Sequence, residues 1–216
     1  MILSRGRGYL FIHIPKTGGT ALSLALEARA MKDDLLVGDT PKARARRHRF
    51  QGFATSGRLW KHSALSDLDG LLHPGEADQL FIFTLVRNPW DRLVSYYHWL
   101  RVQHFENTSV SLAKALTFPE FLWHGHTAES LSAWPYRRYL CDSTGADHCS
   151  AWLRLEHLEA DAEPLHRHLG FSLLPLPRAN ESGRHPDYRG YYSDRDAARV
   201  AALCHDDIAR FGYSFS

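Results

Sequence analysis

The chain has 216 residues, a length that predicts one domain able to bury about 70% of the surface that its unfolded chain exposes. Hydrophobic residues make up 44% of the sequence and charged residues 23%, which excludes a disordered chain, a collagen and a coiled-coil rod. The formal net charge of +2 is too small to indicate a class of partner. No apolar run approaches the ~18 residues of a membrane-spanning helix, and the N-terminus lacks an apolar signal region. We therefore expect a cytoplasmic protein that does not bind membranes.

The first predicted unit is a strand, a glycine-rich loop and a helix. Residues 8–14 form a short run of β-branched and aromatic residues, which is typical of a strand buried on both faces. Residues 15–20 interrupt this run, and residues 21–30 are rich in the helix formers Ala and Leu.

A basic run follows, in which five cations occupy the eight positions from Lys42 to Arg49. We expect a surface loop or a short helix here. Such a run is either a solvated face or a contact surface for an anionic acceptor such as an acidic polysaccharide, and the sequence leaves both open. No nucleic-acid reader motif accompanies it, so we do not expect nucleic acid to bind.

The second predicted unit begins with residues 80–86, the strongest strand pattern in the chain. This strand ends at Arg87, after which Asn88 is a good helix N-cap and Pro89 suits the first helical position. The helix that follows has apolar residues at the spacing of one buried face. They are Trp90, Leu93, Val94, Tyr97 and Leu100.

The C-terminal half contains a third strand and two further helix signals. Residues 117–120 match a capping box, and residues 151–155 suit a core strand followed by a helix through Leu169. The last helix begins near Ser193 and stops at Gly212. Strands that alternate with helices predict a single α/β domain, residues 1–216, with a parallel sheet and helices on both faces.

The glycine-rich loop has the features of an anion site. A strand delivers the chain to a glycine turn, so successive backbone N–H groups point to one spot at the positive end of a helix. An ordinary strand–helix turn with a solvated lysine is the alternative, but the strand, loop and helix context favours an anion. The residues expected to contact it are Lys16, Thr17, Gly18, Gly19 and Thr20.

This loop does not have the order of residues found in ATP-binding loops. The lysine of those loops follows the glycines, whereas Lys16 precedes them. The second strand ends in Arg87 instead of an aspartate that would help to hold Mg²⁺. We therefore expect an anion whose charge is met by Lys and Arg, without a metal.

A second anion contact is predicted at Arg87 and Ser95. Ser95 lies seven residues after Asn88, about two helical turns, so it shares a helix face with this cap. The guanidinium and the hydroxyl can converge on one phosphate. A surface arginine beside an unrelated serine would have the same spacing, so spacing alone leaves both open.

Two segments resemble motifs of sulfotransferases that use 3′-phosphoadenosine 5′-phosphosulfate (PAPS). Residues 11–20 look like the family's 5′-phosphosulfate loop, and residues 86–97 look like its 3′-phosphate motif. The resemblance is greatest to the carbohydrate group, which includes heparan sulfate 2-O-sulfotransferases and small bacterial relatives. It extends, in the family's order, to residues 60–64, 153–158, 180–182, 206–208 and 211–213.

The resemblance implies a P-loop-like sulfotransferase fold that transfers a sulfuryl group from PAPS to an acceptor hydroxyl or amine and leaves PAP. It implies that residues 16–20 hold the 5′ side, with Lys16 meeting the charge of the leaving phosphate. Arg87 and Ser95 would hold the 3′-phosphate. A C-terminal loop that closes over the nucleotide in relatives corresponds here to Asn180, Ser182 and Arg184.

The same resemblance implies that His62 is the general base. A neutral imidazole can take the acceptor's proton near neutral pH, and the charge of Lys61 would help to keep it neutral. Residues 61–65 read Lys-His-Ser-Ala-Leu where the commoner family pattern is Lys-His-Ser-Thr-Ala. Among 14 histidines, His62 can also be structural, and we interpret His13, inside a predicted strand, as a structural donor.

Two other functions stay open at this point: a P-loop kinase that uses ATP and Mg²⁺, and a non-catalytic protein that binds polyanions through the basic run. The sequence does not specify the acceptor, although a carbohydrate hydroxyl is favoured and an anionic saccharide would suit the basic run. Three cysteines are an odd, sparse set that fits reduced thiols. A disulfide between Cys141 and Cys149 stays open.

Overall fold

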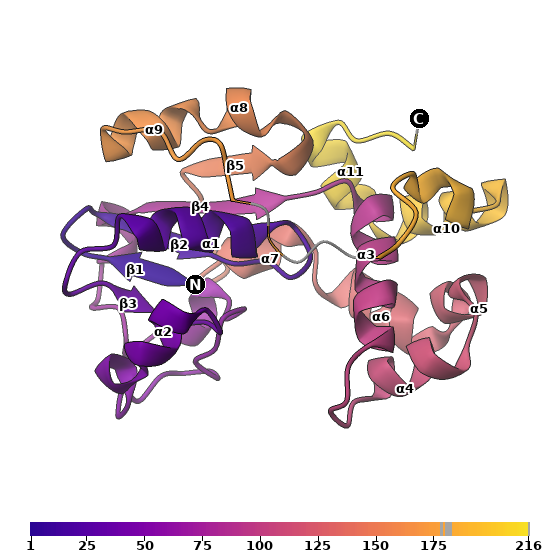
Figure 1. Ribbon diagram of the computed structural model, residues 1–216, viewed down its shortest axis with the longest axis horizontal. Coiled ribbons are helices and arrows are strands. Elements are labelled where there is room, and N and C mark those ends of the chain that lie inside the picture. Colours follow the sequence, from indigo (N-terminus) through magenta and orange to yellow (C-terminus); the bar gives the residue numbers. More distant parts are fainter. Residues whose placement is uncertain (178, 180–182, 216) are drawn as a thin grey trace. The chain divides into compact units, whose positions relative to one another are not determined.

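The computed structural model of the chain describes residues 1–177, 179 and 183–215. It forms two compact units, Met1–Val86 with Tyr136–Ala179 and Arg87–Pro135 with Asn180–Ser216. The first unit contains the β-sheet, and the described part of the second is helical (Figure 1).

The first unit is built on a five-stranded sheet in the order β3-β1-β2-β4-β5. The strands β2, β4 and β5 are parallel, with Phe11 opposite Phe83 and Thr84 opposite Trp152. The three strands predicted from the sequence are therefore confirmed, and they form the parallel part of the sheet. The strands are β1 (Ile2–Ser4), β2 (Tyr9–Ile12), β3 (Leu35–Leu36), β4 (Phe81–Val86) and β5 (Ala151–Arg154).

One edge of this sheet is antiparallel, which the sequence did not predict. The strand β1 pairs with β2 through a tight turn, in which the Gly8 N–H donates to the Arg5 carbonyl at 3.2 Å, and β3 pairs with β1. The two strands have three and two residues, too few for a period of hydrophobicity to be visible. The expectation of a parallel sheet therefore holds for β2, β4 and β5 and not for β1 and β3.

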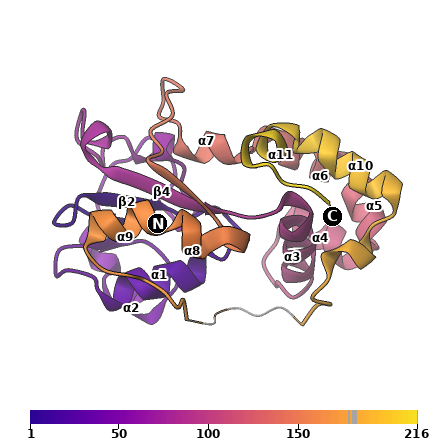
Figure 2. The same cartoon turned by 90° about the horizontal axis from the view of Figure 1, so that it is seen from above.

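The helices α1 and α9 cover one face of the sheet. Leu22 and Leu26 of α1 share a buried cluster with Leu165 of α9 and with Phe11 and Phe83 of the sheet. Figure 2 shows α7 on the other side of β4 from α1, so helices lie on both faces, as expected. The helices of this unit are α1 (Gly19–Ala28), α2 (Pro41–Ala45), α7 (Tyr136–Leu140), α8 (Leu158–Asp161) and α9 (Glu163–Leu169).

Two segments of the first unit consist of short helical pieces: the basic run, as expected, and the segment after β5, for which one helix was predicted. The basic run forms α2, capped by the Thr40 hydroxyl, which accepts from the Ala43 N–H at 3.1 Å, and then a 3₁₀ turn at Arg47–Phe50. The helix predicted after β5 is divided into a 3₁₀ turn, α8 and α9. Pro164 accounts for the last break, because it has no N–H to continue the ladder of the preceding turn.

The second unit is organised around the predicted amphipathic helix, α3. The Asn88 side chain caps it by accepting from the Trp90 N–H at 3.1 Å, as the sequence indicated. The apolar face of α3 is buried in a cluster shared with α4, α5 and α10. The helices of this unit are α3 (Pro89–Arg101), α4 (Thr108–Ala115), α5 (Phe118–Trp123), α6 (Gly125–Ala133), α10 (Asp194–Leu203) and α11 (His205–Phe211).

Other helix ends in this unit follow local signals. The Thr117 N–H donates to the Glu120 carboxylate at 2.8 Å, which confirms the predicted start of α5. The prediction of one C-terminal helix is wrong: the chain leaves helical geometry at Cys204 and divides into α10 and α11. A break of one residue leaves the periodicity of the apolar side chains intact, so the pattern did not reveal it. Gly212 ends α11 with φ 65°, as predicted.

The cysteines and the helix lengths bear on two earlier expectations. All three cysteines are thiols, so no disulfide joins Cys141 to Cys149. None of the helices in the described part of the chain is long and apolar enough to cross a membrane.

Candidate active site

The glycine-rich loop joins the end of β2 to α1. Gly18 is the residue before α1 and has φ 89°, a left-handed conformation that glycine adopts without steric cost. Lys16 also has a positive φ, 67°, and is the one non-glycine residue with this conformation in the described chain. No acidic residue lies in the first turn of α1. The positive end of this helix dipole is therefore not neutralised by a carboxylate of its own first turn.

Close packing holds this loop in place. The buried Thr17 hydroxyl donates its hydrogen bond to the Ile14 carbonyl at 2.9 Å, within the loop. Any contact of Thr17 with an anion would therefore use its backbone N–H. A Cβ on Gly18 would lie 3.0 Å from Leu155, and a Cβ on Gly19 would lie 2.2 Å from the His13 ring. The packing of the His13 ring therefore requires glycine at position 19, and the left-handed φ of Gly18 favours glycine at position 18. Thr20, the second residue of α1, is half-buried.

His62 lies in a loop of the same unit that Ser63 closes. The Ser63 hydroxyl donates to the Arg58 carbonyl at 2.7 Å and accepts from the Trp60 N–H at 2.9 Å. The exposed Trp60 ring lies edge-on to the His62 ring, with 5.0 Å between their centroids. Lys61 pairs with Asp39 at 2.5 Å. The residues before and after His62 thus fix the loop that carries the imidazole.

The hydrogen bond of His62 determines its tautomer. Its Nδ1 lies 2.7 Å from the His13 carbonyl oxygen, which can only accept, so Nδ1 carries the proton and Nε2 keeps its lone pair in the neutral ring. The pKa of His62 is lowered to about 3, chiefly by burial and also by the charge of Lys61, while the hydrogen bond to the His13 carbonyl opposes this shift. His62 is therefore neutral over the physiological range, with one nitrogen able to accept a proton.

The second unit brings two predicted arginines together through a carboxylate. Arg87 Nε donates to Asp91 Oδ2 at 2.7 Å, and Arg184 Nη2 donates to the other oxygen of Asp91. The side chains of Arg87 and Arg184 are only 15% and 9% exposed, and that of Asp91 is 17% exposed. Arg184 Nη1 is buried and has no hydrogen-bond partner among the described residues, a donor that a bound anion would satisfy.

Ser95 lies one helical turn beyond Asp91 on α3 and is buried. It therefore belongs to the same helix face as the carboxylate that holds the two arginines. Asn180 and Ser182, predicted from the resemblance to contact the nucleotide, lie outside the described residues.

The predicted site residues thus form two groups, one in each unit. The first unit carries the loop from Lys16 to Thr20 and His62, and the second carries Arg87, Ser95 and Arg184. Sequence reasoning missed Asp91, although its place four residues after Arg87, in the first turn of α3, is the usual spacing of a helical ion pair.

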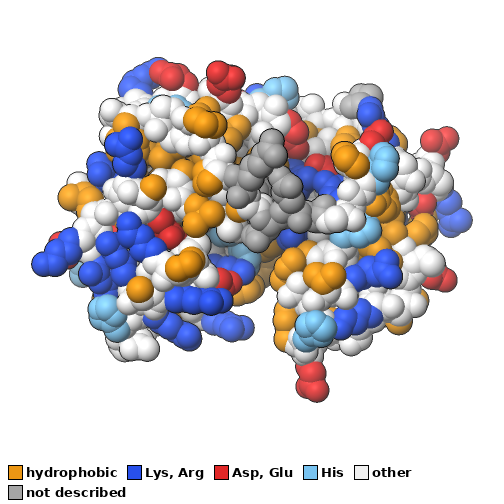
Figure 3. Space-filling model, viewed as in Figure 1, with side chains coloured by type: hydrophobic (Ala, Val, Ile, Leu, Met, Phe, Trp, Pro, Cys, Tyr) orange, Lys and Arg blue, Asp and Glu red, His pale blue; other side chains and the backbone are white. Residues whose placement is uncertain are grey.

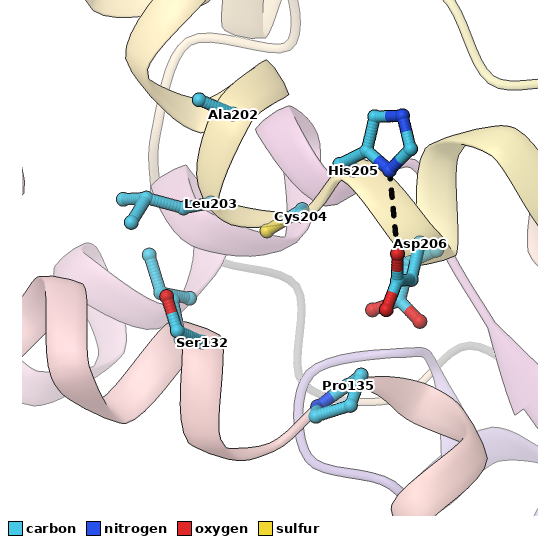
Figure 4. A pocket seen from close by; sticks show the side chains of 9 residues that line it. Ser132, Pro135, Ala202, Leu203, Cys204, His205 and Asp206 are labelled. Carbon is cyan, nitrogen blue, oxygen red and sulfur yellow. Dashed lines mark hydrogen bonds and ion pairs between the residues drawn. The ribbon is translucent and has the colours of Figure 1, made fainter.

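A separate pocket of about 250 Å³ lies in the second unit between α6 and the break from α10 to α11. Figure 4 shows Cys204 between these elements and His205 directed to Asp206, 3.3 Å away. Burial raises the pKa of the Cys204 thiol to about 12, so it is protonated and a poor nucleophile. None of the predicted site residues lines this pocket.

Metal ligands do not gather in the part of the chain that the structure describes. Within it, no three His, Cys, Asp or Glu side chains lie where they would hold one ion. The donors at the loop are backbone N–H groups and Lys16, and those on α3 are guanidinium groups. This set suits a phosphate or sulfuryl anion.

Comparison with known proteins agrees with these donor sets. The profile described as "Sulfotransferase family" matches residues 1–214, nearly the whole chain. No curated protein matches the sequence. The match favours neither a kinase nor a non-catalytic polyanion-binding protein, the two alternatives that the sequence left open. The chain therefore belongs to the sulfotransferase family and is an enzyme that transfers sulfuryl groups.

Proposed function

We propose that the chain, as one functional domain over residues 1–216, transfers the sulfuryl group of PAPS to an acceptor hydroxyl and releases PAP. PAPS supplies an activated sulfuryl group on a phosphate that can leave. The observation that carries this proposal is the neutral His62, whose Nδ1 is held by the carbonyl of His13, the residue that also packs against the anion loop. The odd, sparse set of three cysteines supports a cytoplasmic location.

In this proposal the loop neutralises the negative charge that develops on the leaving phosphate oxygens. The N–H groups from Gly18 to Thr20 and the positive end of α1 provide fixed dipoles, and Lys16 provides a charge. Donors that are already oriented cost no reorganisation during the reaction, which makes such electrostatic stabilisation the largest contribution in many enzymes.

His62 acts as the general base. Its Nε2 accepts the proton of the acceptor hydroxyl as the oxygen bonds to sulfur, and its Nδ1–H stays bound to the His13 carbonyl. The fixed tautomer is the support for this role, because the nitrogen that must accept is the one that the protein leaves unprotonated.

Arg87, Arg184 and Ser95 hold the 3′-phosphate. Asp91 orients the two guanidinium groups, and the unsatisfied Arg184 Nη1 supports a contact with a further anion. We place Asn180 and Ser182 in the same nucleotide contact on the resemblance alone.

The acceptor is a saccharide, and an anionic one suits the surface of the first unit. From Thr40 to Ser66 the chain has seven Lys and Arg residues and no Asp or Glu. Figure 3 shows Lys and Arg side chains gathered over α2 and the segment around it. His62 belongs to this segment, so an acidic polysaccharide attracted to it would be brought close to the base.

The test is transfer of label from PAPS to a panel of hydroxyl-bearing saccharides, neutral and acidic, in the presence of EDTA. We expect a labelled product with wild type and loss of it with Lys16→Ala. PAP should also raise the melting temperature without a metal, whereas ATP with Mg²⁺ should not. Stabilisation by ATP–Mg²⁺ and not by PAP would contradict the proposal.

A further inference from the structure

His13 occupies the junction between the anion loop and the candidate base. It follows β2 directly and is only 6% exposed. Its ring stacks on Phe11 with 5.7 Å between centroids and meets the His62 ring edge-on at 4.6 Å. The sequence alone suggested a structural donor here, but the ring donates to no group in the described chain.

The ring of His13 is directed to the first residue of α1. A Cβ built on Gly19 would lie 2.2 Å from Cδ2 and 2.5 Å from Nε2 of this imidazole. The edge that carries Nε2 therefore occupies the space in which any other residue at position 19 would have its side chain. This space adjoins the positive end of α1, where the loop presents its backbone N–H groups.

The hydrogen-bonding capacity of this ring is unused. His62 takes the His13 backbone carbonyl, and neither ring nitrogen of His13 has a hydrogen-bond partner among the described residues. Burial, followed by the positive groups around it, holds the pKa of His13 well below its ordinary value, so the ring is neutral and carries one N–H. The ring nitrogens are not among the fully buried polar atoms, so the little exposure that the side chain keeps includes them, and a ligand group can reach this N–H.

We propose that His13 is a catalytic residue whose Nε2–H donates a hydrogen bond to the sulfuryl group bound at the N-terminus of α1. The inference rests on the proposed function. During transfer, the bond between the acceptor oxygen and sulfur forms and the bond between sulfur and the phosphate oxygen breaks. The hydroxyl proton goes to His62 Nε2, and His13 keeps its own proton throughout. Its N–H stabilises charge on the sulfuryl oxygens.

Calorimetric titration of PAPS and PAP into wild type, His13→Leu and His13→Gln tests this contact without knowledge of the acceptor. PAP lacks the sulfuryl group, so the ratio of the two dissociation constants isolates contacts with it. We expect the preference for PAPS to fall about tenfold in His13→Leu, the size of one hydrogen bond to a charged group. His13→Gln should recover part of it, since the Gln amide can place an N–H near the position of Nε2. All three proteins keep the backbone carbonyl that holds His62.

Phe11→Leu is the matched control, because it removes the ring that stacks on His13 and leaves the donor in place. Its melting temperature should fall while its preference for PAPS stays that of wild type. An unchanged preference in a folded His13→Leu variant would overturn the inference, and so would equal losses in His13→Leu and Phe11→Leu. Wild type that binds neither PAPS nor PAP would instead refute the proposed function.

Discussion

Replacement of Arg87 by Ala removes one donor of the arginine pair and leaves the ion pair between Asp91 and Arg184 in place. Asp91 binds both arginines, so in Arg87→Ala its carboxylate stays paired with Arg184 and no charge is left buried alone. The helix cap at Asn88 and the buried face of α3 are also retained. A loss of affinity in this variant would therefore report the missing contact and not a damaged fold.

The size of the loss follows from the type of contact. The Arg87 side chain is 15% exposed, so its hydrogen bond to a phosphate would be largely shielded from water. A charge-assisted hydrogen bond of this kind contributes about 2 kcal/mol, which corresponds to about a 30-fold change in Kd. Asp91 already balances part of the Arg87 charge, so the expected loss of binding free energy is smaller than for an arginine without a carboxylate partner.

Titration of PAP and adenosine 5′-phosphate into wild type and Arg87→Ala measures the effect. Only PAP carries the 3′-phosphate, so its affinity should fall about 30-fold while that of adenosine 5′-phosphate changes little. Arg101→Ala is the control, because Arg101 is exposed on the same helix and stacks on the Tyr97 ring at 5.5 Å. Equal losses for both ligands, or no loss for PAP, would refute the assignment of the 3′-phosphate to this arginine.

Three further variants test the first unit. Lys16→Ala should lower kcat by roughly 10²-fold and weaken PAP binding less, since the backbone N–H groups remain; a normal kcat would remove Lys16 from the mechanism. Gly19→Ala should lower the free energy of unfolding by about 1–3 kcal/mol in chemical denaturation, because its Cβ would lie 2.2 Å from the buried His13 ring; full stability would mean that this ring moves freely. His62→Gln should lose less stability than wild type between pH 7 and pH 5. The pKa of His62 is lowered to about 3 in the folded protein, so at a pH below the ordinary histidine pKa only the unfolded chain takes up the proton. This uptake lowers the free energy of unfolding of wild type by at most about 2 kcal/mol at pH 5. Identical acid dependence in the two proteins would contradict the burial of His62.

Local signals were sufficient for the elements that carry the candidate site. The loop after β2 was recognisable because the apolar run, the glycines and the Ala- and Leu-rich segment change type within a few residues. The start of α3 was equally clear, since Asn88 and Pro89 are residues with specific roles at that point. Short elements gave no such signal: two residues of β3 have no period, and the break at Cys204 leaves the apolar face of the surrounding sequence intact.

Contacts between distant residues were beyond the reach of sequence patterns. Arg184 lies 93 positions after Asp91, and their ion pair follows from the folding of the second unit. The contact of the His13 ring with Gly19 could not be predicted either. The apolar run around His13 predicts a strand but does not indicate which residue the ring contacts. The spacing of Arg87 and Ser95 predicted a common helix face, and the carboxylate that orients the arginine lies on that face between them.

His62 shows how the physical cause of an expected property can differ from the one that the sequence suggests. Its neutrality was expected from the charge of Lys61, which itself pairs with Asp39, but burial is the larger cause. A histidine base with an ordinary pKa would lose its proton near neutral pH, and turnover would rise with pH there. His62 is already neutral in this range, so it contributes no inflection to the pH profile of turnover. So low a pKa makes the free imidazole a weak base. An anion bound at the loop of the same unit would raise the pKa of His62 and oppose the effect of burial, so the base would gain strength when the sulfuryl donor is present.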